Sequence, residues 1–245
     1  MGDRRVAVIS DAGGYVGPAL ARLLAADHDL VVGDPADGLV ADLQAAGAAV
    51  EVCTGTRDLS EVSVSTALVS RALDRFGRLD AAVAFTGRIV VGRFLRSTID
   101  DLRDAVVGCV EAPYLFLREV VPAMIDRGGG QVLLFTSAAG ARPTPGAPLY
   151  SSARAAANML VRNVAAEVVD RNVQINAIGT NFMDFPGFLK ANRAEEPEGR
   201  ARVEASVPMG RLGTMDELAH MALPFIDGTS RFTTGQFVAF AGGWA

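Results

Sequence analysis

The order of apolar segments predicts an α/β fold, a doubly wound parallel sheet of about seven strands in a three-layer αβα arrangement. Short runs rich in β-branched residues alternate with longer stretches of helical periodicity, as such a sheet requires. The 245 residues are 50% hydrophobic, enough for one sizeable core, so we expect a single domain over residues 1–245. The chain shows no repeat, low-complexity segment or interdomain linker.

The expected elements follow from these periodicities. Strands are predicted at residues 6–10, 30–33, 49–53, 81–85, 131–136, 174–178 and 236–240. Helices are predicted at 16–26, 39–46, 60–76, 98–126, 148–170 and 215–226. Segment 179–208 has no strand pattern and is rich in aromatic, proline and charged residues. We expect it to cover the substrate at the carboxyl end of the sheet, where open α/β folds bind their ligands.

The turn after the first strand is rich in glycine but interrupted at two positions. It reads Val8-Ile9-Ser10-Asp11-Ala12-Gly13-Gly14-Tyr15-Val16-Gly17. A dinucleotide-binding turn needs glycines that let backbone approach the pyrophosphate, and Asp11 and Tyr15 stand where two of them belong in a Rossmann-like fold. We therefore expect no nucleotide cofactor. Asp11 could instead cap the next helix, and Tyr15 could pack on the sheet. Asp34 opposes this expectation, because it stands where an NAD-binding protein holds ribose.

Three polar residues form the candidate catalytic site: Ser137, Tyr150 and Arg154. Tyr150 and Arg154 are four residues apart on the predicted helix 148–170, so they share one face. The permanent guanidinium charge favours the phenolate, which would let Tyr150 act as a base. Ser137 directly follows the strand 131–136, so its hydroxyl is expected beside this helix, holding a substrate oxygen while Tyr150 exchanges the proton.

Composition excludes several classes of function. The net charge of -5 and the scattered arginines leave no basic face for nucleic acid. Two cysteines and two histidines are too few and too far apart for a disulfide framework or a usual zinc site. The N-terminus Met1-Gly2-Asp3-Arg4-Arg5 resembles no signal or myristoylation motif, and no apolar run is long enough to cross a bilayer. We expect a cytoplasmic protein without a metal.

The chain resembles the halohydrin dehalogenases, relatives of the short-chain dehydrogenases, over its whole length. The resemblance lies in Ser137, Tyr150 and Arg154, with Arg in place of the dehydrogenase Lys, in the aromatic Tyr15, and in the run Asn176-Ala177-Ile178-Gly179-Thr180-Asn181-Phe182-Met183-Asp184-Phe185-Pro186. Segments 14–20 and 179–189 are closest to the G-type subgroup, whose members accept bulky internal and ring-fused epoxides. The run Ala84-Phe85-Thr86-Gly87 replaces the dehydrogenase Asn-Asn-Ala-Gly, and Cys109 replaces a helix Asn.

The resemblance implies a cofactor-independent lyase that closes vicinal haloalcohols to epoxides with halide release and opens epoxides with azide, cyanide, nitrite or halide. It makes Tyr150 the base, Ser137 the substrate-binding hydroxyl and Arg154 the cation that keeps Tyr150 ionised. The implied pocket for halide or nucleophile comprises Tyr15, Thr180, Asn181, Phe182 and Met183. The implied substrate pocket comprises Phe85, Thr86, Phe185 and Pro186. A homotetramer, built through the helices 98–126 and 148–170, is also implied.

Two other functions stay open. One is an NAD(P)-dependent short-chain oxidoreductase with a degenerate glycine loop, which Asp34 favours and which Asp11, Tyr15 and Arg154 oppose. The other is a catalytically dead regulator that senses a dinucleotide. The intact set of Ser137, Tyr150 and Arg154 argues against that regulator.

Overall fold

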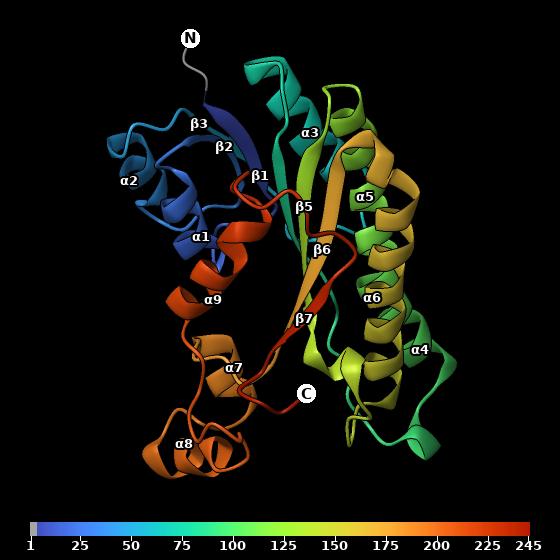
Figure 1. Ribbon diagram of the computed structural model, residues 1–245. Helices are drawn as coiled ribbons and strands as arrows, with labels where there is room; N and C mark the ends of the chain where they lie inside the picture. The colour runs from blue at the N-terminus through green and yellow to red at the C-terminus, as the bar shows by residue number, and fades with distance from the viewer. Residues whose placement is uncertain (1–3) are drawn as a thin grey trace.

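A seven-stranded parallel sheet forms the centre of the computed structural model, which describes residues 4–245 (Figure 1). The strands are β1 Arg5–Ile9, β2 His28–Gly33, β3 Val50–Cys53, β4 Ala81–Phe85, β5 Gly130–Ser137, β6 Val173–Thr180 and β7 Phe237–Phe240. Their order across the sheet is β3-β2-β1-β4-β5-β6-β7, and all neighbours are parallel. This arrangement confirms the predicted doubly wound sheet. Residues 1–3, on which the expectation about targeting motifs partly depended, lie outside the described residues.

Helices cover both faces of the sheet. They are α1 Gly17–Leu24, α2 Leu39–Ala45, α3 Val62–Phe76, α4 Ile99–Val106, α5 Ala112–Ile125, α6 Pro148–Val168, α7 Pro186–Ala191, α8 Pro197–Glu204 and α9 Met215–Ala222. In Figure 1, α1, α2 and α9 lie on one side of the sheet and α3, α5 and α6 on the other. The result is the expected three-layer αβα fold.

The core consists of two apolar layers, because alternate residues of a strand point to opposite faces. In β5, Val132 and Leu134 pack toward α3, α5 and α6. Leu133 and Phe135 pack toward α1 and α9. All eight residues of β5 are buried, as expected for a strand covered on both faces. Ser137 is thereby fixed at the end of the most enclosed part of the sheet.

The predicted helix 98–126 contains a π-helical turn. Thr98 begins it with a capping box, in which its hydroxyl accepts from the Asp101 N–H and the Asp101 carboxylate accepts from the Thr98 N–H. The α-helix α4 then gives way to a π turn at Val107–Glu111, and α5 continues from Ala112. Such turns insert one extra residue into a helix and are frequent near functional sites. This one places Cys109 in the cluster that packs around Tyr150.

Segment 179–208 contains two short helices that the sequence pattern does not predict. Helices α7 and α8 lie beyond the carboxyl end of β6, at the bottom of the molecule in Figure 1. Each begins with a proline, which suits the first turn of a helix because its missing N–H would have no partner there. The segment therefore stands at the edge of the sheet where Ser137 ends β5.

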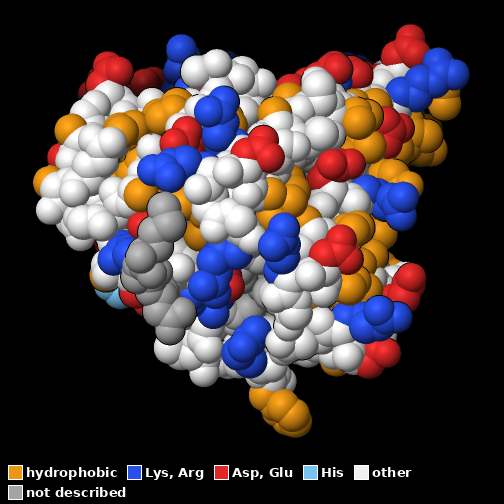
Figure 2. Space-filling view, turned by 90° about the horizontal axis from the view of Figure 1, so that it is seen from above, with side chains coloured by type: hydrophobic (Ala, Val, Ile, Leu, Met, Phe, Trp, Pro, Cys, Tyr) orange, Lys and Arg blue, Asp and Glu red, His pale blue; other side chains and the backbone are white. Residues whose placement is uncertain are grey.

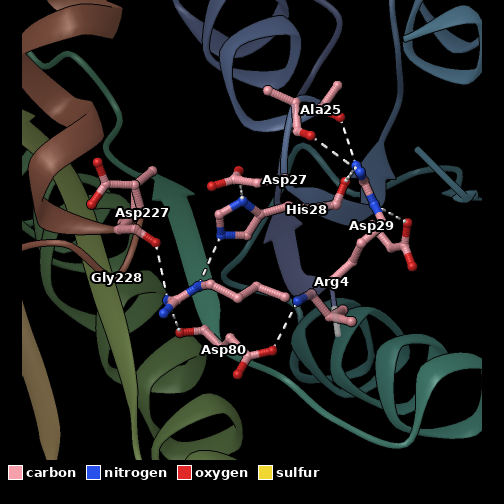
Figure 3. A network of polar contacts seen from close by, with 12 residues as sticks. Arg4, Ala25, Asp27, His28, Asp29, Asp80, Asp227 and Gly228 are labelled. Atoms are coloured by element: carbon pink, nitrogen blue, oxygen red, sulfur yellow. Dashed lines mark hydrogen bonds and ion pairs between the residues drawn. The ribbon is translucent and has the colours of Figure 1, made fainter. Parts of the chain in front are cut away.

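A polar network joins the amino ends of β1 and β2 (Figure 3). His28 is completely buried, and its Nδ1 lies 2.5 Å from an Asp27 carboxylate oxygen. The Arg5 Nε–H donates to His28 Nε2 at 3.1 Å, so Nε2 carries no proton and Nδ1 is the protonated nitrogen of a neutral ring. Arg5 also donates to the carbonyl oxygens of Asp80 and Ile226. Burial lowers the pKa of both Arg5 and His28.

The face of the molecule drawn in Figure 2 carries mixed charge. Figure 2 looks onto the end of the molecule that bears the N-terminus, where Lys and Arg side chains are intermixed with Asp and Glu. Within residues 4–245, no helix has both the length and the apolar character to cross a bilayer.

Candidate active site

Ser137 lies where β5 meets a short 3₁₀ turn, Ala138–Ala141. Its hydroxyl oxygen accepts a hydrogen bond from the Ala139 N–H at 3.1 Å, which caps this turn. The same hydroxyl is 3.4 Å from the Thr180 carbonyl oxygen on the neighbouring strand β6, a long and weak contact. The Ser137 proton can therefore turn to a substrate oxygen at little cost.

Helix α6 carries Tyr150 in its first turn and Arg154 one turn later, as the sequence predicts. Both side chains are buried. The helix is fixed against the 3₁₀ turn after Ser137, since the Ser151 hydroxyl donates to the Ala139 carbonyl at 2.7 Å. One turn after Arg154 on α6, the Asn158 side-chain oxygen accepts a hydrogen bond from the Thr136 hydroxyl at 3.0 Å. These contacts hold the end of β5 beside the residues that carry Tyr150 and Arg154.

Arg154 places a positive charge over the face of the Tyr150 ring. Its Cζ is 5.1 Å from the ring centroid, within the range of a cation–π contact. Its Nη2 donates to the Thr86 carbonyl at 2.5 Å and its Nη1 to the Thr86 hydroxyl at 3.3 Å. The third nitrogen, Nε, is buried and has no partner among the described residues. Gly87 makes this arrangement possible, because a Cβ there would stand 1.9 Å from Nη2.

Tyr15 reaches from the loop after β1 to the carboxyl ends of the central strands. Its hydroxyl donates to the Thr180 hydroxyl oxygen at 2.6 Å, and Thr180 pairs with Ser137 in the sheet register. Burial raises the pKa of Tyr15 well above the ordinary value, so this phenol stays protonated and serves as a donor. The backbone of Tyr15 has φ of 51°, in the left-handed region.

Three phenylalanine rings enclose the Tyr15 ring. Phe85 and Phe135 stack on one another with centroids 5.0 Å apart, and each meets Tyr15 edge to face at 6.1 and 6.2 Å. Phe185, from the segment after β6, lies 5.0 Å from Tyr15. Edge-to-face contacts of this kind are favourable arrangements for aromatic pairs. Phe85 and Phe185 were expected at the site, whereas Phe135 reads as an ordinary core position of an apolar strand.

Three of the other expected pocket residues line a different hollow. A cavity of about 300 Å³ separates the turn after β6 from the C-terminal segment, and Asn181, Phe182 and Met183 line it. Ser137, Tyr150 and Arg154 do not. The Asn181 N–H donates to the Phe240 carbonyl and the Phe182 N–H to the Asn181 side chain, so neither is free to bind an anion. Pro186 begins α7 next to Phe185.

The glycine loop does not fit a dinucleotide in this conformation. The Tyr15 ring fills the space at the carboxyl ends of β4 and β5, where α/β folds of this type bind their ligand. The Asp11 carboxylate accepts from the Gly13 N–H at 2.8 Å and puts a negative charge beside the place for a pyrophosphate. Val16, and not Asp11, is the residue that precedes α1.

Asp34 is likewise engaged. Its carboxylate accepts from the N–H groups of Gly55 and Thr56, both at 2.8 Å, and from the Thr56 hydroxyl at 3.3 Å. These bonds lower the pKa of Asp34 despite the opposing effect of burial. A ribose would have to share or displace them. In the part of the chain that the structure describes, no three His, Cys, Asp or Glu side chains are grouped as a metal site would need.

Comparison with known proteins shows that the chain is similar to dehydrogenases and reductases. A family model described as enoyl-(acyl carrier protein) reductase matches residues 16–245. The chain is 27% identical over 246 residues to 2,5-dichloro-2,5-cyclohexadiene-1,4-diol dehydrogenase LinX of Sphingobium indicum, with 98% of this chain and 96% of that protein covered. It is 28% identical over 248 residues to a 3-oxoacyl-(acyl-carrier-protein) reductase of Synechocystis, with 98% and 96% covered.

Solved structures agree. Acetoin dehydrogenase from Enterobacter cloacae superposes with a TM-score of 0.85 at 25% identity, covering 98% of this chain and 96% of that one. The structure of 7α-hydroxysteroid dehydrogenase complexed with NADH and 7-oxo glycochenodeoxycholic acid also gives a TM-score of 0.85, at 26% identity and with 98% and 93% covered.

These similarities contradict the dehalogenase function expected from the sequence. The matched proteins are named as dehydrogenases and reductases, so a lyase that forms and opens epoxides is the wrong class. The physical reason is that Ser137 and Tyr150 move a proton at a substrate oxygen in either chemistry, so they do not distinguish the two. The prediction therefore depended on the interrupted glycine loop at Asp11 and Tyr15, on Arg154 and on the resemblance of segments such as 176–186.

Proposed function

Since this chain belongs to the short-chain dehydrogenase/reductase family, we propose that it is an oxidoreductase that interconverts a hydroxyl and a carbonyl group on a small substrate. The observation that carries the class of reaction is the match of residues 16–245 to a reductase family. The convergence of the Ser137 turn with Tyr150 and Arg154 on α6 supports which residues would handle the proton. A hydroxyl that can turn to a substrate oxygen, beside a phenol under a fixed cation, is suited to general acid–base catalysis at that oxygen.

The residues divide the work at the substrate oxygen. Ser137 would donate its proton to the oxygen by a hydrogen bond and give up its weak contact with Thr180. Tyr150 would donate a proton to that oxygen in reduction and, as phenolate, accept one in oxidation. Arg154 would keep a fixed positive charge over the face of the Tyr150 ring beside the reacting oxygen.

Tyr150 accounts for the proton only. An alcohol that becomes a carbonyl loses a proton from oxygen and a hydride from carbon. The hydride requires a carrier, which in this chemistry is a nicotinamide dinucleotide. The conformation of Tyr15 described above leaves no room for that carrier, so we assign only the proton transfer to named residues.

The substrate would enter over the carboxyl end of β5. We propose that Phe85, Thr86, Phe185 and Pro186 border this approach and that segment 179–208, with α7 and α8, covers it. Rings from β4 and from the segment after β6 give it an apolar lining. An apolar or aromatic body next to the reacting hydroxyl would suit such walls.

Steady-state assays would test the function. Absorbance of NADH and NADPH would be followed with a panel of ketones and secondary alcohols, first for the parent protein. We expect Tyr150→Phe to lower kcat by about 10²-fold or more without unfolding the protein, since it removes only the hydroxyl. Tyr114→Phe, which changes an exposed tyrosine on α5, is the matched control and should retain the parent rate. Equal rates in the parent and Tyr150→Phe would refute the assignment.

We also propose a homotetramer, as the resemblance implies. Helices α4 to α6 leave several large apolar side chains exposed: Ile99, Leu102, Tyr114 and Met159. Such side chains on adjacent helices would be covered if copies of the chain packed through them. Light scattering should then give four times the 25.6 kDa mass of one chain. A mass equal to one chain would contradict the tetramer.

A further inference from the structure

Tyr15 occupies the site that a dinucleotide would need, and it does so with many contacts. The ring touches Phe85, Phe135 and Phe185, which come from three different segments. Its hydroxyl reaches Thr180 at the end of β6, beside Ser137. Tyr15 therefore covers the carboxyl ends of β4, β5 and β6, next to the candidate catalytic residues.

The closed position opposes the intrinsic preference of the backbone. A tyrosine with φ of 51° is in a region that residues with a Cβ seldom adopt. Ring contacts and one neutral hydrogen bond hold it there, and both can be exchanged for contacts with a planar ligand. Gly14, next to Tyr15, has no Cβ, and glycine adopts more backbone conformations than other residues, which favours a change of the loop at this point.

We propose that Tyr15 is a gate for the dinucleotide: the structure is the closed form, and the carrier binds only after the Tyr15 ring leaves its aromatic neighbours and Thr180. This inference rests on the proposed oxidoreductase function. The chain belongs to a family of dehydrogenases and reductases, yet Tyr15 fills the dinucleotide site. The gate accounts for both facts, because Tyr15 excludes a nicotinamide ring in the closed position and would border its site in the open position. Binding to a form that is populated only in part weakens the apparent affinity by that fraction.

Calorimetric titration of NADH and NADPH would test the gate in three variants. Tyr15→Gly removes the ring and accepts positive φ without strain, so it should bind a dinucleotide at least about tenfold more tightly than the parent. Tyr15→Phe keeps the ring and loses only the bond to Thr180, so a gain of about three- to tenfold is expected. Thr180→Val removes the same bond from the other side, leaves the loop sequence intact and should match Tyr15→Phe.

The outcomes separate this proposal from the proposed function. Equal dissociation constants for the parent, Tyr15→Gly and Thr180→Val would overturn the gate while leaving the oxidoreductase function in place. No binding by any of the four proteins would overturn the gate and remove the hydride carrier as well. Tighter binding by the variants supports the gate whether or not the tested alcohols and ketones turn over. If Tyr15→Gly fails to fold, the Tyr15→Phe and Thr180→Val pair still decides, because each alters a single polar contact.

Discussion

Gly87→Ala tests how the buried guanidinium of Arg154 is held over Tyr150. The new Cβ would stand 1.9 Å from Nη2 and 2.3 Å from Cζ, so Arg154 has to move. Gly87 also has φ of 116°, which alanine adopts only with strain. Left-handed strain of about 1–2 kcal/mol and the loss of a charged hydrogen bond to Thr86, worth about 1.5–3 kcal/mol, together predict a loss of roughly 3–5 kcal/mol in the free energy of unfolding.

Urea unfolding of five proteins would measure this loss: the parent, Gly87→Ala, Gly128→Ala, Arg154→Ala and the double variant of Gly87 and Arg154. Gly128→Ala is the matched control, because Gly128 has φ of 90° and nothing lies within 4 Å of its added Cβ. It should lose only the backbone strain of about 1–2 kcal/mol. In an Arg154→Ala background the clash is gone, so Gly87→Ala should then cost the same as the control, giving a coupling of about 2–3 kcal/mol in the double-mutant cycle.

Two results would refute the reasoning. A loss in Gly87→Ala no larger than in Gly128→Ala would show that Arg154 moves aside without cost. Additive effects of Gly87→Ala and Arg154→Ala would show that the two residues do not interact. The first result would leave Gly87 with a backbone role only.

Three further predictions concern charge and capping. Arg154→Lys should retain more activity than Arg154→Ala in the steady-state assay if Tyr150 needs a positive charge, and equal losses would point to the paired contacts with Thr86. The pKa of His28 is lowered in the folded protein because the ring is buried. The contribution of neutral His28 to the free energy of unfolding is therefore complete above the unfolded pKa of about 6.5. As the pH falls below that value, the free energy of unfolding decreases by at most about 1.4 kcal/mol per pH unit. Urea unfolding between about pH 5 and pH 8 should show this slope in the parent and not in His28→Gln; the same slope in both would exclude His28. Thr98→Ala should lower the free energy of unfolding by about 1 kcal/mol through loss of the capping box, and an unchanged urea midpoint would contradict this.

Apolar periodicity was enough to predict the strands. Strand β4 was predicted at its observed limits, because Ala81–Phe85 is a short apolar run with a sharp beginning and end in the sequence. The predicted 131–136 stops one residue short at each end of β5, since Gly130 and Ser137 carry no apolar signal. Ser137, Tyr150 and Arg154 were found because their positions follow from a strand end and one helical face.

Other parts of the site leave no trace in a single sequence. The contact between Arg154 and the Thr86 carbonyl depends on backbone, which any residue at position 86 would supply. The π turn at Val107–Glu111 has no distinctive residue type. Helix α7 has only six residues, and α8 is rich in charged residues, with Gly199 and Val203 as its buried residues, so neither shows an apolar periodicity. The dehalogenase prediction failed for a different reason, because Ser137 and Tyr150 move a proton at a substrate oxygen in both chemistries and so do not distinguish them.

The network around Arg5 also constrains the order in which the chain can complete its fold. Arg5 belongs to β1, yet one of its acceptors is the carbonyl of Ile226, 221 residues further along the chain. Gln131, 126 residues away, is another. Before residue 226 has been synthesised, the amino ends of β1 and β2, with Arg5 and His28, are therefore still open to water. Water then makes part of the hydrogen bonds of these two side chains. We expect the amino ends of β1 and β2 to become fully enclosed only after Ile226, which follows α9, has left the ribosome.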